Sequence, residues 1–578
     1  MIRNDNLRIN IYFVFILAAA AVISYNLFIL TYSKHRSYLR TAQAQNQNIS
    51  NVLARGNIYL GENLAATNKK FPLAYVVPVD INNQSSEEVS EQIALVLKID
   101  KSEIKKIIDS HSDKFRVLAR RINNEQVEVI KNLKIKGFGA TYEIDRFYPG
   151  DFLAADVLGF IGYSGLSGQG EVKSGQYGVE SFYNEELFGK KWSTDGSITG
   201  SSAVRLLSKL FHLGPGKEAD VKGKVDRPAD LVLSINKDIQ QFVEDRLDFL
   251  VKKWDAVQGT IIVQDPNTGG IIAMADRPSF NPNSYSDYEP RNFLNQGVQE
   301  IFEPGSSFKP ITMAMGLDLG FVSPQTTFKD EGPRVISGYK INNFSEKIFG
   351  TVTMSEVLEK SINTGAMYVQ DLVGDDNFLN YIINFGFGQR TGLDLPGEVN
   401  GDISNLYSGR KINFLTASFG QGIAVTPIQL INAYSTIANG GKLMRPYLVE
   451  KVVKEGGDEE LTKPEIIAIP ISEKTSTKLK SMLVGVVDNG FDKARISGYD
   501  IAGKTGTAQI PDGKGGYLEN EYIHDFVGFA PAFNPKFVIL IKIDRPKGIT
   551  FAADSLSPTF KEITQYLLNY YVIAPTRR

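Results

Sequence analysis

The sequence predicts an α+β fold in which an antiparallel sheet is backed by helices. Two hairpin patterns carry this prediction. The apolar runs Gly259–Gln264 and Gly270–Ala275 flank an Asp-Pro-Asn-Thr-Gly turn, and Phe526–Ala530 and Phe537–Ile543 flank a proline-bounded turn near the C-terminus. The sequence between the two hairpins is mostly helical in pattern. Strands at both ends of a helical middle are typical of a domain whose helices cover a single sheet.

Two amphipathic helices are expected to cover that sheet. The segment Lys237–Lys253 follows the expected strand Leu231–Ile235, and its apolar residues recur at helical spacing along one side. A second helix closes the chain, with one apolar side made by Phe560, Ile563, Leu567 and Tyr570. We expect this C-terminal domain to span residues 226–578.

The segment Ile11–Leu30 is expected to anchor the chain in a membrane. It carries no charged residue, and twenty residues rising ~1.5 Å each extend about 30 Å, one hydrocarbon thickness. Its N-terminal position and its lack of a polar face argue against a buried core helix, and its apolar run is longer than that of a cleaved signal peptide. The positive charges on either side do not favour one orientation. We therefore expect a short tail and anchor over residues 1–33.

Between the anchor and the C-terminal domain, residues 34–225 mix short strand-like and helical patterns with many turns. The segment Phe182–Phe188 predicts a helix that ends at Gly189. Residues 214–230 carry Gly, Pro and charge without periodicity, which indicates a domain boundary. The expected architecture is an anchor, an elongated mixed domain at 34–225 and the α+β domain.

The composition argues against several classes of function. Among 578 residues, 63 Lys and Arg nearly balance 65 Asp and Glu, so no global basic field favours nucleic acid. The chain has no Cys and four His. Disulfides, cysteine metal sites and a thiol nucleophile are therefore excluded, and a Ser-His-Asp triad or a His-rich metal site is disfavoured. We expect no metal and no cofactor.

One motif is a decoy. Residues 498–505, Gly-Tyr-Asp-Ile-Ala-Gly-Lys-Thr, match the phosphate-binding P-loop pattern. A P-loop needs a helix that begins at the Lys-Thr pair, because the helix N-terminus holds the phosphates. Here Thr505 is followed by residues typical of a strand and a turn. The sequence therefore argues against nucleotide binding.

The pair Ser306 and Lys309 is a candidate for covalent catalysis. The two residues lie three apart where a helix is expected to begin, so they share one face of its first turn. A hydroxyl there would have an amine base within reach and backbone N–H groups near an oxyanion. Ser-x-x-Lys also occurs at Ser102, Ser337 and Ser408, where we expect solvated surface. Ser307 is excluded as the partnered serine because Pro310 stands three residues later.

Two further motifs are ambiguous alone. Ser361 and Asn363 form a Ser-x-Asn pattern that is also common in turns and helix caps. Lys504-Thr505-Gly506-Thr507 could be a strand that carries a surface lysine. We expect Gly506 to let a ligand approach the strand edge closely.

The order and spacing of the three motifs resemble those of penicillin-binding proteins and serine β-lactamases. Ser-x-Asn follows Ser-x-x-Lys by 55 residues, and Lys-Thr-Gly follows 143 residues later. Over nearly its whole length the chain resembles class B penicillin-binding proteins, with matching phrases such as RNFLNQGVQEIFEPGSSFKP, GKTGTAQ and FVGFAPA. The N-terminal domain shares Arg55-Gly56 and residues 146–150, but Tyr59–Asn63 replaces the family's usual Asp-Arg-Asn-Gly turn.

The resemblance implies a peptidoglycan D,D-transpeptidase with a pedestal domain and a β-lactamase-like catalytic domain. The enzyme would cross-link stem peptides through a serine acyl-enzyme and release D-alanine. Its implied residues are Ser306 as nucleophile, Lys309 as base, Ser361 as proton relay, Asn363 for the substrate backbone, and Lys504, Thr505, Gly506 and Thr507 around the terminal carboxylate. Backbone N–H groups of Ser306 and Thr507 would form the oxyanion hole.

The resemblance also implies partners and a location. The chain would sit in the bacterial cytoplasmic membrane through a single span, with the catalytic domain outside. Its partners would be donor and acceptor stem peptides, β-lactams as covalent inhibitors, a multi-spanning membrane glycosyltransferase and other division proteins. Nucleic acid is not expected.

Alternatives stay open within and beyond the family. Ser361 to Gly365 and the Lys-Thr-Gly form resemble the division type. Some elongation enzymes have a Cys and His zinc site, whereas this chain has no Cys and no His between His212 and His524. The sequence favours septal synthesis over elongation. A β-lactamase or β-lactam sensor, or a non-catalytic division scaffold, fits the full set of motifs less well.

Overall fold

The computed structural model describes residues 55–81, 85–111, 115–167, 170–188, 228–336, 338–454, 456–490, 492–513 and 516–577, together with Leu17. No helix in these ranges is long and apolar enough to cross a membrane. The expected anchor at Ile11–Leu30, Leu17 apart, and most of the expected boundary at 214–230 lie outside the described residues. The described chain forms two compact units, Asn68–Arg146 and a larger unit of Gly56–Thr67 with the residues from Phe147 onward.

The smaller unit packs three helices against strands. Strand β2 (Asn63–Val76) pairs with β3 (Arg116–Arg120) and β4 (Phe138–Phe147). The helices are α3 (Ser86–Leu97), α4 (Lys101–Ile108) and α5 (Asn124–Leu133). Each begins after a residue whose side chain caps its first N–H groups, namely Ser85, Asp100 and Asn123. Their apolar faces meet in a core of their own that includes Ile93, Ile104 and Ile130.

The larger unit joins the start of the described chain to strands far along the sequence. β1 (Ile58–Leu60) pairs in parallel with β7 (Asp230–Leu233), and β7 pairs antiparallel with β15 (Val449–Val453), which in turn pairs with β16 (Glu459–Leu461). The same unit contains α6 (Ala155–Leu158), β5 (Phe160–Ser167) and β6 (Gly170–Gln176).

The helix expected at Phe182–Phe188 is divided, so this prediction is wrong in its extent. The structure has α7 (Gly178–Phe182) and α8 (Asn184–Phe188), separated by Tyr183 with φ −99° and ψ 32°. The Asn184 side chain accepts from the Gly175 N–H at 2.9 Å. This tie to β6 starts a new helix instead of continuing the old one. Gly189 lies outside the described residues.

The predicted antiparallel sheet is confirmed, with both expected hairpins at their expected positions. Its strand order is β18 (Ala502–Pro511), β19 (Tyr517–Ala530), β20 (Phe537–Asp544), β8 (Gln258–Gln264) and β9 (Ile271–Arg277). Every neighbouring pair is antiparallel. Strand β18 has one neighbour only and forms an edge of this sheet.

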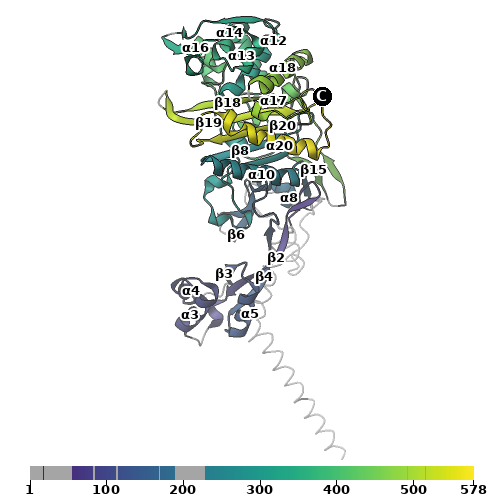
Figure 1. Cartoon of the computed structure of the whole chain (residues 1–578). Coiled ribbons are helices and arrows are strands. Elements are labelled where there is room, and N and C mark those ends of the chain that lie inside the picture. Colours follow the sequence, from purple (N-terminus) through teal and green to yellow (C-terminus); the bar gives the residue numbers. More distant parts are fainter. Residues whose placement is uncertain are drawn as a thin grey trace, which may run out of the picture. The chain divides into compact units, whose positions relative to one another are not determined.

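Helices cover both faces of the sheet (Figure 1). The two predicted helices, α10 (Lys237–Lys253) and α20 (Ser557–Tyr570), cover one face, and α17 (Pro427–Ala438) covers the other. Figure 1 shows α12, α13, α14 and α16 gathered beyond the β18 edge. The other α-helices of this unit are α11 (Gln296–Gln299), α12 (Lys309–Asp318), α13 (Met354–Glu359), α14 (Asn363–Val373), α15 (Asp375–Asn384), α16 (Lys411–Ala417), α18 (Glu473–Gly485) and α19 (Ala552–Ser555). Three further sheets have two strands each: β10 (Thr327–Asp330) with β13 (Gly350–Thr353), β11 (Arg334–Ile336) with β12 (Tyr339–Ile341), and β14 (Leu443–Met444) with β17 (Ile466–Ala468).

Candidate active site

The serine and lysine of the first motif meet at the start of α12. Gly305–Phe308 forms a 3-10 turn that runs directly into this helix, so Ser306 and Lys309 lie one turn apart. Lys309 Nζ is 3.0 Å from Ser306 Oγ. Ser306 is half-buried, whereas Ser307 is fully buried and its hydroxyl donates to the Pro304 carbonyl at 2.8 Å. The fold thus brings Ser306, and not Ser307, to the lysine.

The surroundings of Lys309 suit a neutral amine. Its side chain is buried, and burial lowers its pKa well below the ordinary lysine value, with the nearby positive charge of Lys504 lowering it further. Lys309 Nζ lies 2.6 Å from the Ser361 carbonyl oxygen and 3.1 Å from Ser361 Oγ. A neutral amine has two protons and one lone pair. It can therefore donate both protons to Ser361 and keep the lone pair for the proton of Ser306.

The second motif lies where α13 ends and α14 begins. Ser361 has a φ of +54°, a left-handed conformation that is uncommon for residues with a side chain. This strained turn presents both the carbonyl and the hydroxyl of Ser361 to Lys309. The Asn363 side chain donates to the Asn342 carbonyl at 2.9 Å, which fixes the amide and leaves its Oδ1 as an acceptor.

The third motif lies on the edge strand β18. The chain continues as a strand from Thr505 to Pro511, so the P-loop-like stretch lacks the helix that phosphate binding requires, as predicted. Lys504 is buried, and burial lowers its pKa to about 8. The Thr507 hydroxyl oxygen accepts from the Ala552 N–H at 3.1 Å. That contact leaves the hydroxyl proton of Thr507 available to a ligand.

The reason for glycine at position 506 differs from the predicted one. A Cβ atom on Gly506 would lie 2.0 Å from Asp525 Oδ2 and 2.4 Å from the Pro304 carbonyl oxygen. The space that a side chain would need is thus occupied by the protein itself. Glycine at this position lets strand β18 pack against the loop that precedes Ser306 and against a carboxylate on β19.

Two loops hold the second and third motifs and touch each other. Asn342, which accepts from Asn363, precedes Phe344, and Phe551 precedes Ala552, which donates to Thr507. The Phe344 and Phe551 rings meet edge to face, with centroids 4.9 Å apart. Both rings are exposed. The segments that position the second and third motifs are therefore in direct contact.

Sequence reasoning missed three residues that support the site. Tyr434 on α17 donates its hydroxyl to the Ser307 carbonyl at 2.6 Å and so fixes the turn that carries Ser306. Asn342 holds Asn363, and Asp525 lies behind Gly506. A sequence signal existed for Asp525 alone, because a charged residue stands directly before the apolar run Phe526–Ala530.

The Ser-x-x-Lys patterns at Ser102, Ser337 and Ser408 behave as expected where they are described. Ser102 and Ser408 are exposed, the former on α4 and the latter at the end of a short 3-10 helix. Lys340 is exposed on β12, and Ser337 lies outside the described residues. A buried lysine at helical spacing distinguishes Ser306 from these serines.

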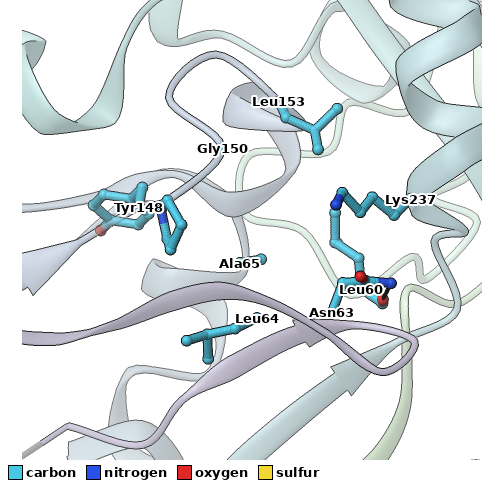
Figure 2. A pocket seen from close by; sticks show the side chains of 9 residues that line it. Leu60, Asn63, Leu64, Ala65, Tyr148, Gly150, Leu153 and Lys237 are labelled. Carbon is cyan, nitrogen blue, oxygen red and sulfur yellow. Dashed lines mark hydrogen bonds between the residues drawn. The ribbon is translucent and has the colours of Figure 1, made fainter.

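Two cavities away from the motifs lie beside α10. One of about 100 Å³ is lined by residues that include Leu60, Leu64, Tyr148, Leu153 and Lys237 (Figure 2). Its neighbour of about 440 Å³ shares Gly150 and Leu153 with it. None of the eight predicted site residues lines either cavity. Within the described ranges, no group of three or more His, Asp or Glu side chains is placed to hold a metal ion.

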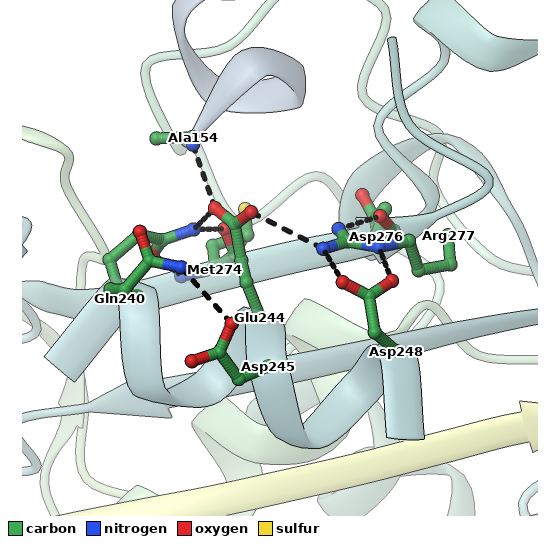
Figure 3. A network of polar contacts seen from close by, with 9 residues as sticks. Ala154, Gln240, Glu244, Asp245, Asp248, Met274, Asp276 and Arg277 are labelled. Carbon is green, nitrogen blue, oxygen red and sulfur yellow. Dashed lines mark hydrogen bonds and ion pairs between the residues drawn. The ribbon is translucent and has the colours of Figure 1, made fainter. Parts of the chain in front are cut away.

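A buried polar network borders the larger cavity (Figure 3). Glu244 on α10 accepts from the Ala154 N–H at 2.8 Å and from Gln240 at 2.9 Å, and it pairs with Arg277 at 3.3 Å. Arg277 also pairs with Asp248. Burial raises the pKa of Glu244, and its donors oppose that rise. The network ties the segment around Ala154 to α10 and β9, so its role is structural.

A half-buried serine, a buried amine and a second serine together define a site for acyl transfer through a covalent intermediate. Comparison with known families agrees. Residues 259–565 match the penicillin binding protein transpeptidase domain, and residues 51–198 match the penicillin-binding protein dimerisation domain. The chain belongs to the penicillin-binding protein family, as the transpeptidase domain covers more than half of it and the dimerisation domain precedes that domain.

Individual relatives agree with this assignment. Stage V sporulation protein D of Bacillus subtilis is 32% identical over 521 residues, which is 89% of this chain and 77% of that protein. Peptidoglycan D,D-transpeptidase FtsI of Buchnera aphidicola is 31% identical over 520 residues, 87% of this chain and 86% of the relative. The fold is that of penicillin binding protein 3 of Mycobacterium tuberculosis, solved with aztreonam, at a TM-score of 0.68 and 24% identity over 91% of this chain and 98% of that one.

Proposed function

We propose that this chain, a peptidoglycan D,D-transpeptidase of the penicillin-binding protein family, uses Ser306 as its nucleophile. The observation that carries the proposal is the 3.0 Å contact between Ser306 Oγ and the amine of buried Lys309. A serine hydroxyl is a weak nucleophile until an adjacent base takes its proton. Lys309 is the group placed to do so.

Acylation follows from this geometry. Ser306 Oγ attacks the carbonyl carbon between the two terminal D-alanines of a donor stem peptide, while Lys309 Nζ takes the hydroxyl proton. The C–N bond then breaks, and the departing amine of D-alanine receives a proton through the Ser361 hydroxyl, which lies 3.1 Å from Lys309 Nζ. The products are a Ser306 ester and free D-alanine.

Transfer reverses these proton movements. An amine of a second stem peptide attacks the ester carbonyl and loses its proton to the Lys309 and Ser361 pair. The ester C–O bond breaks, and the Ser306 oxygen regains a proton. The net result is a new amide cross-link and an unchanged enzyme. Water would give only hydrolysis at the same step.

The remaining motif residues are suited to hold the donor. Lys504 supplies a buried positive charge, and the hydroxyls of Thr505 and Thr507 supply donors for the terminal carboxylate. The Asn363 Oδ1 is available to a substrate N–H. The backbone N–H groups of Ser306 and Thr507 would bind the oxyanion. Their closeness is supported by Gly305, whose added Cβ would lie 3.0 Å from the Thr507 carbonyl oxygen.

Labelling with a fluorescent penicillin tests the nucleophile. The full chain in detergent is expected to form one covalent adduct, and mass spectrometry of its peptides is expected to place the label on Ser306. Ser306→Ala should abolish labelling, whereas the matched control Ser307→Ala should retain it. A label that persists in Ser306→Ala, or that maps to another residue, would refute the assignment.

The lifetime of the adduct separates the alternatives. A transpeptidase releases the penicilloyl group slowly, a β-lactamase turns it over rapidly, and a scaffold forms no adduct. We expect an adduct that outlasts the assay, together with release of D-alanine from a donor stem peptide when an acceptor is present.

We further propose a septal role and a bitopic arrangement. Support comes from the names of the relatives, FtsI and stage V sporulation protein D, and from the motif around Ser361. The domains would be a tail and anchor at 1–33, a pedestal at 34–225 and the catalytic domain at 226–578 outside the cytoplasmic membrane. A membrane glycosyltransferase and division proteins would be its partners. A fluorescent fusion should gather at the septum, whereas uniform lateral signal would indicate elongation.

A further inference from the structure

A buried carboxylate lies directly behind the third motif and has no part in the chemistry above. Asp525 on β19 is fully buried and stands opposite Gly506 in the β18–β19 ladder. Lys504 stands opposite Val527 in the same ladder. Side chains two residues apart on a strand point to the same face. Asp525 and Lys504 therefore share one face of the sheet as diagonal neighbours on adjacent strands.

The carboxylate is wedged between β18 and the loop that carries the nucleophile. A Cβ atom added to Gly506 would lie 2.0 Å from Asp525 Oδ2 and 2.4 Å from the Pro304 carbonyl oxygen. Both oxygens therefore border the backbone of Gly506. The neighbouring Ser307 hydroxyl gives its single proton to Pro304. With that proton on Pro304, no donor among the described residues bonds either oxygen of Asp525, and the Ser307 hydroxyl is the neighbour that would lower the pKa of Asp525 by turning toward it. Buried carboxylates are normally paired, so this one requires an explanation.

The groups that face Asp525 come from four elements. Lys504 faces it from β18, Lys542 from β20, Tyr434 from α17 and Ser307 from the turn before α12. Lys542 is already committed elsewhere, because it pairs with Asp544 at 2.5 Å and lies 3.9 Å from Glu300.

Charge links Asp525 to Lys504. Burial raises the pKa of Asp525 to about 7, and Ser307, Lys504 and Lys542 oppose that rise. Burial lowers the pKa of Lys504 to about 8, and the charge of Asp525 opposes that fall. Each group therefore favours the ionised form of the other. Asp525 and Lys504 are therefore both ionised between about pH 7 and about pH 8.

We propose that Asp525 is a positioning residue whose buried carboxylate keeps Lys504 protonated, so that Lys504 can hold the donor's terminal carboxylate while Lys309 stays neutral. The proposal rests on the proposed function and deepens it. The proposed chemistry needs Lys504 protonated and Lys309 neutral, although both are buried near Ser306. An anion beside Lys504 alone would favour the protonated form of Lys504 and not that of Lys309. Asp525 lies behind Lys504, whereas Lys309 faces Ser361 and Ser306 instead.

The test compares the pH profiles of acylation. The full chain and Asp525→Asn are reacted with a fluorescent penicillin between about pH 5.5 and pH 9. Asn keeps the shape of the side chain but removes its charge. At low pH the parent's Asp525 is itself neutral, so the two profiles should nearly coincide. Near pH 8 the variant should acylate roughly 5-fold more slowly if its Lys504 pKa falls by about one unit, because a smaller fraction of Lys504 is then protonated.

Two controls separate an electrostatic role from a structural one. Asp276→Asn removes another buried carboxylate of the same sheet, and because burial raises the pKa of Asp276 only to about 6, it should scale the rate equally at every pH above about 7. Lys504→Gln removes the group through which Asp525 acts, so adding Asp525→Asn to it should change little. Asp525→Ser, which removes the same charge with a smaller side chain, should reproduce the pH-dependent loss if the Asn variant proves unstable.

The outcomes distinguish this proposal from the function on which it rests. If the parent is labelled on Ser306 but the Asp525 variants lose the same factor at every pH, the positioning role is overturned and the proposed nucleophile stands. The role is also overturned if Asp525→Asn and Lys504→Gln have fully additive effects. If the parent forms no adduct on Ser306, the proposed function itself has failed.

Discussion

Two neighbouring rows of the five-stranded sheet, one residue apart along each strand, differ completely in chemistry. One row, Phe526, Ile541, Ile261 and Ala275, crosses β19, β20, β8 and β9 on the face covered by α10 and α20. We call it the apolar row. The next row, Asp525, Lys542, Thr260 and Asp276, crosses the same strands toward α11 and α17. We call it the polar row. Both rows are buried.

The difference shows how one sheet serves two purposes. The apolar row stabilises the fold, since each buried Phe or Ile side chain contributes about 1.5–3 kcal/mol. The polar row places charges where water is excluded, which costs free energy unless the charges are paired. It ends at Gly506 in the third motif. Stability and the electrostatics of the site are thus separated by a single residue step, because strand side chains alternate between faces.

The largest effect is expected beyond the polar row, at Lys309. Lys309→Arg keeps a positive charge but cannot supply a neutral amine, so acylation should fall about 10³-fold while the fold persists. In the parent, acylation should rise with pH as Lys309 loses its proton and fall above about pH 8 as Lys504 does. Stopped-flow acylation measures both.

Lys504→Arg is the matched control for that prediction. It retains a cation for the donor carboxylate and should keep more activity than Lys309→Arg. If Lys309→Arg acylated nearly as fast as the parent, Lys309 would be only an electrostatic anchor and the base would lie elsewhere.

In the apolar row, Phe526→Ala should destabilise the domain without changing its chemistry. The Phe526 ring is fully buried and stacks on Phe560 at 4.1 Å between centroids. Its removal should cost about 3–5 kcal/mol, as for other buried Phe side chains. Denaturant unfolding of the full chain in detergent measures the loss. The pH profile of acylation per folded molecule should not move. A shifted profile would contradict the claim that the apolar row affects stability and not the electrostatics of the site.

In the polar row, Lys542→Met should destabilise the protein in a pH-dependent way. Removing Lys542 leaves Asp544 without its paired cation and takes away one of the two cations that face Asp525, which should cost about 3 kcal/mol when these carboxylates are ionised. The pKa of Asp525 is raised to about 7, so its share of the cost should be present above that pH and shrink below it. Melting curves at about pH 5.5 and pH 8 measure the difference.

An exposed ion pair provides the contrast for Lys542. Lys451 pairs with Glu459 at 3.0 Å on the surface strands β15 and β16. Lys451→Met should cost less than about 1 kcal/mol at either pH. Equal losses in both variants would mean that burial does not set the energetics of the polar row.

The smallest effect is expected for Ile541→Val, beside Lys542. This change removes one methylene from the apolar row and should cost about 1 kcal/mol at every pH. Thermal melting measures the loss. A pH-dependent effect would contradict the independence of the two rows.

Much of the architecture was predictable because it depends on local pattern. The hairpins around residues 265–269 and 531–535 follow from short apolar runs with turn residues between them. The helix Lys237–Lys253 has its predicted bounds, since Asn236 caps it and its apolar residues recur at helical spacing. The strand after Thr505 was predicted by the same local reasoning, and it argues against nucleotide binding at the P-loop-like stretch.

Local pattern failed where a distant contact decides. The helix at Phe182–Phe188 divides because Asn184 bonds to Gly175 on a neighbouring strand. The glycine at 506 was assigned to the approach of a ligand, yet its space is filled by Asp525 and Pro304. Asn184 and Gly175 stand only nine residues apart, but their bond depends on where β6 lies in the fold, and Gly506 is 19 residues from Asp525 and much further from Pro304.

The sequence by itself determined the three motifs, their order, and the identity of Ser306, Lys309, Ser361, Asn363 and Lys504 as candidates, because side-chain chemistry and helical spacing are properties of the chain. The tertiary structure alone decided that Lys309 is buried away from water and that both oxygens of Ser361 face the Lys309 amine. It also decided that Asp525 lies behind Lys504. Those facts depend on desolvation and on charges brought together from strands and helices far apart in sequence. Protonation states are set by such surroundings, and only folding creates them.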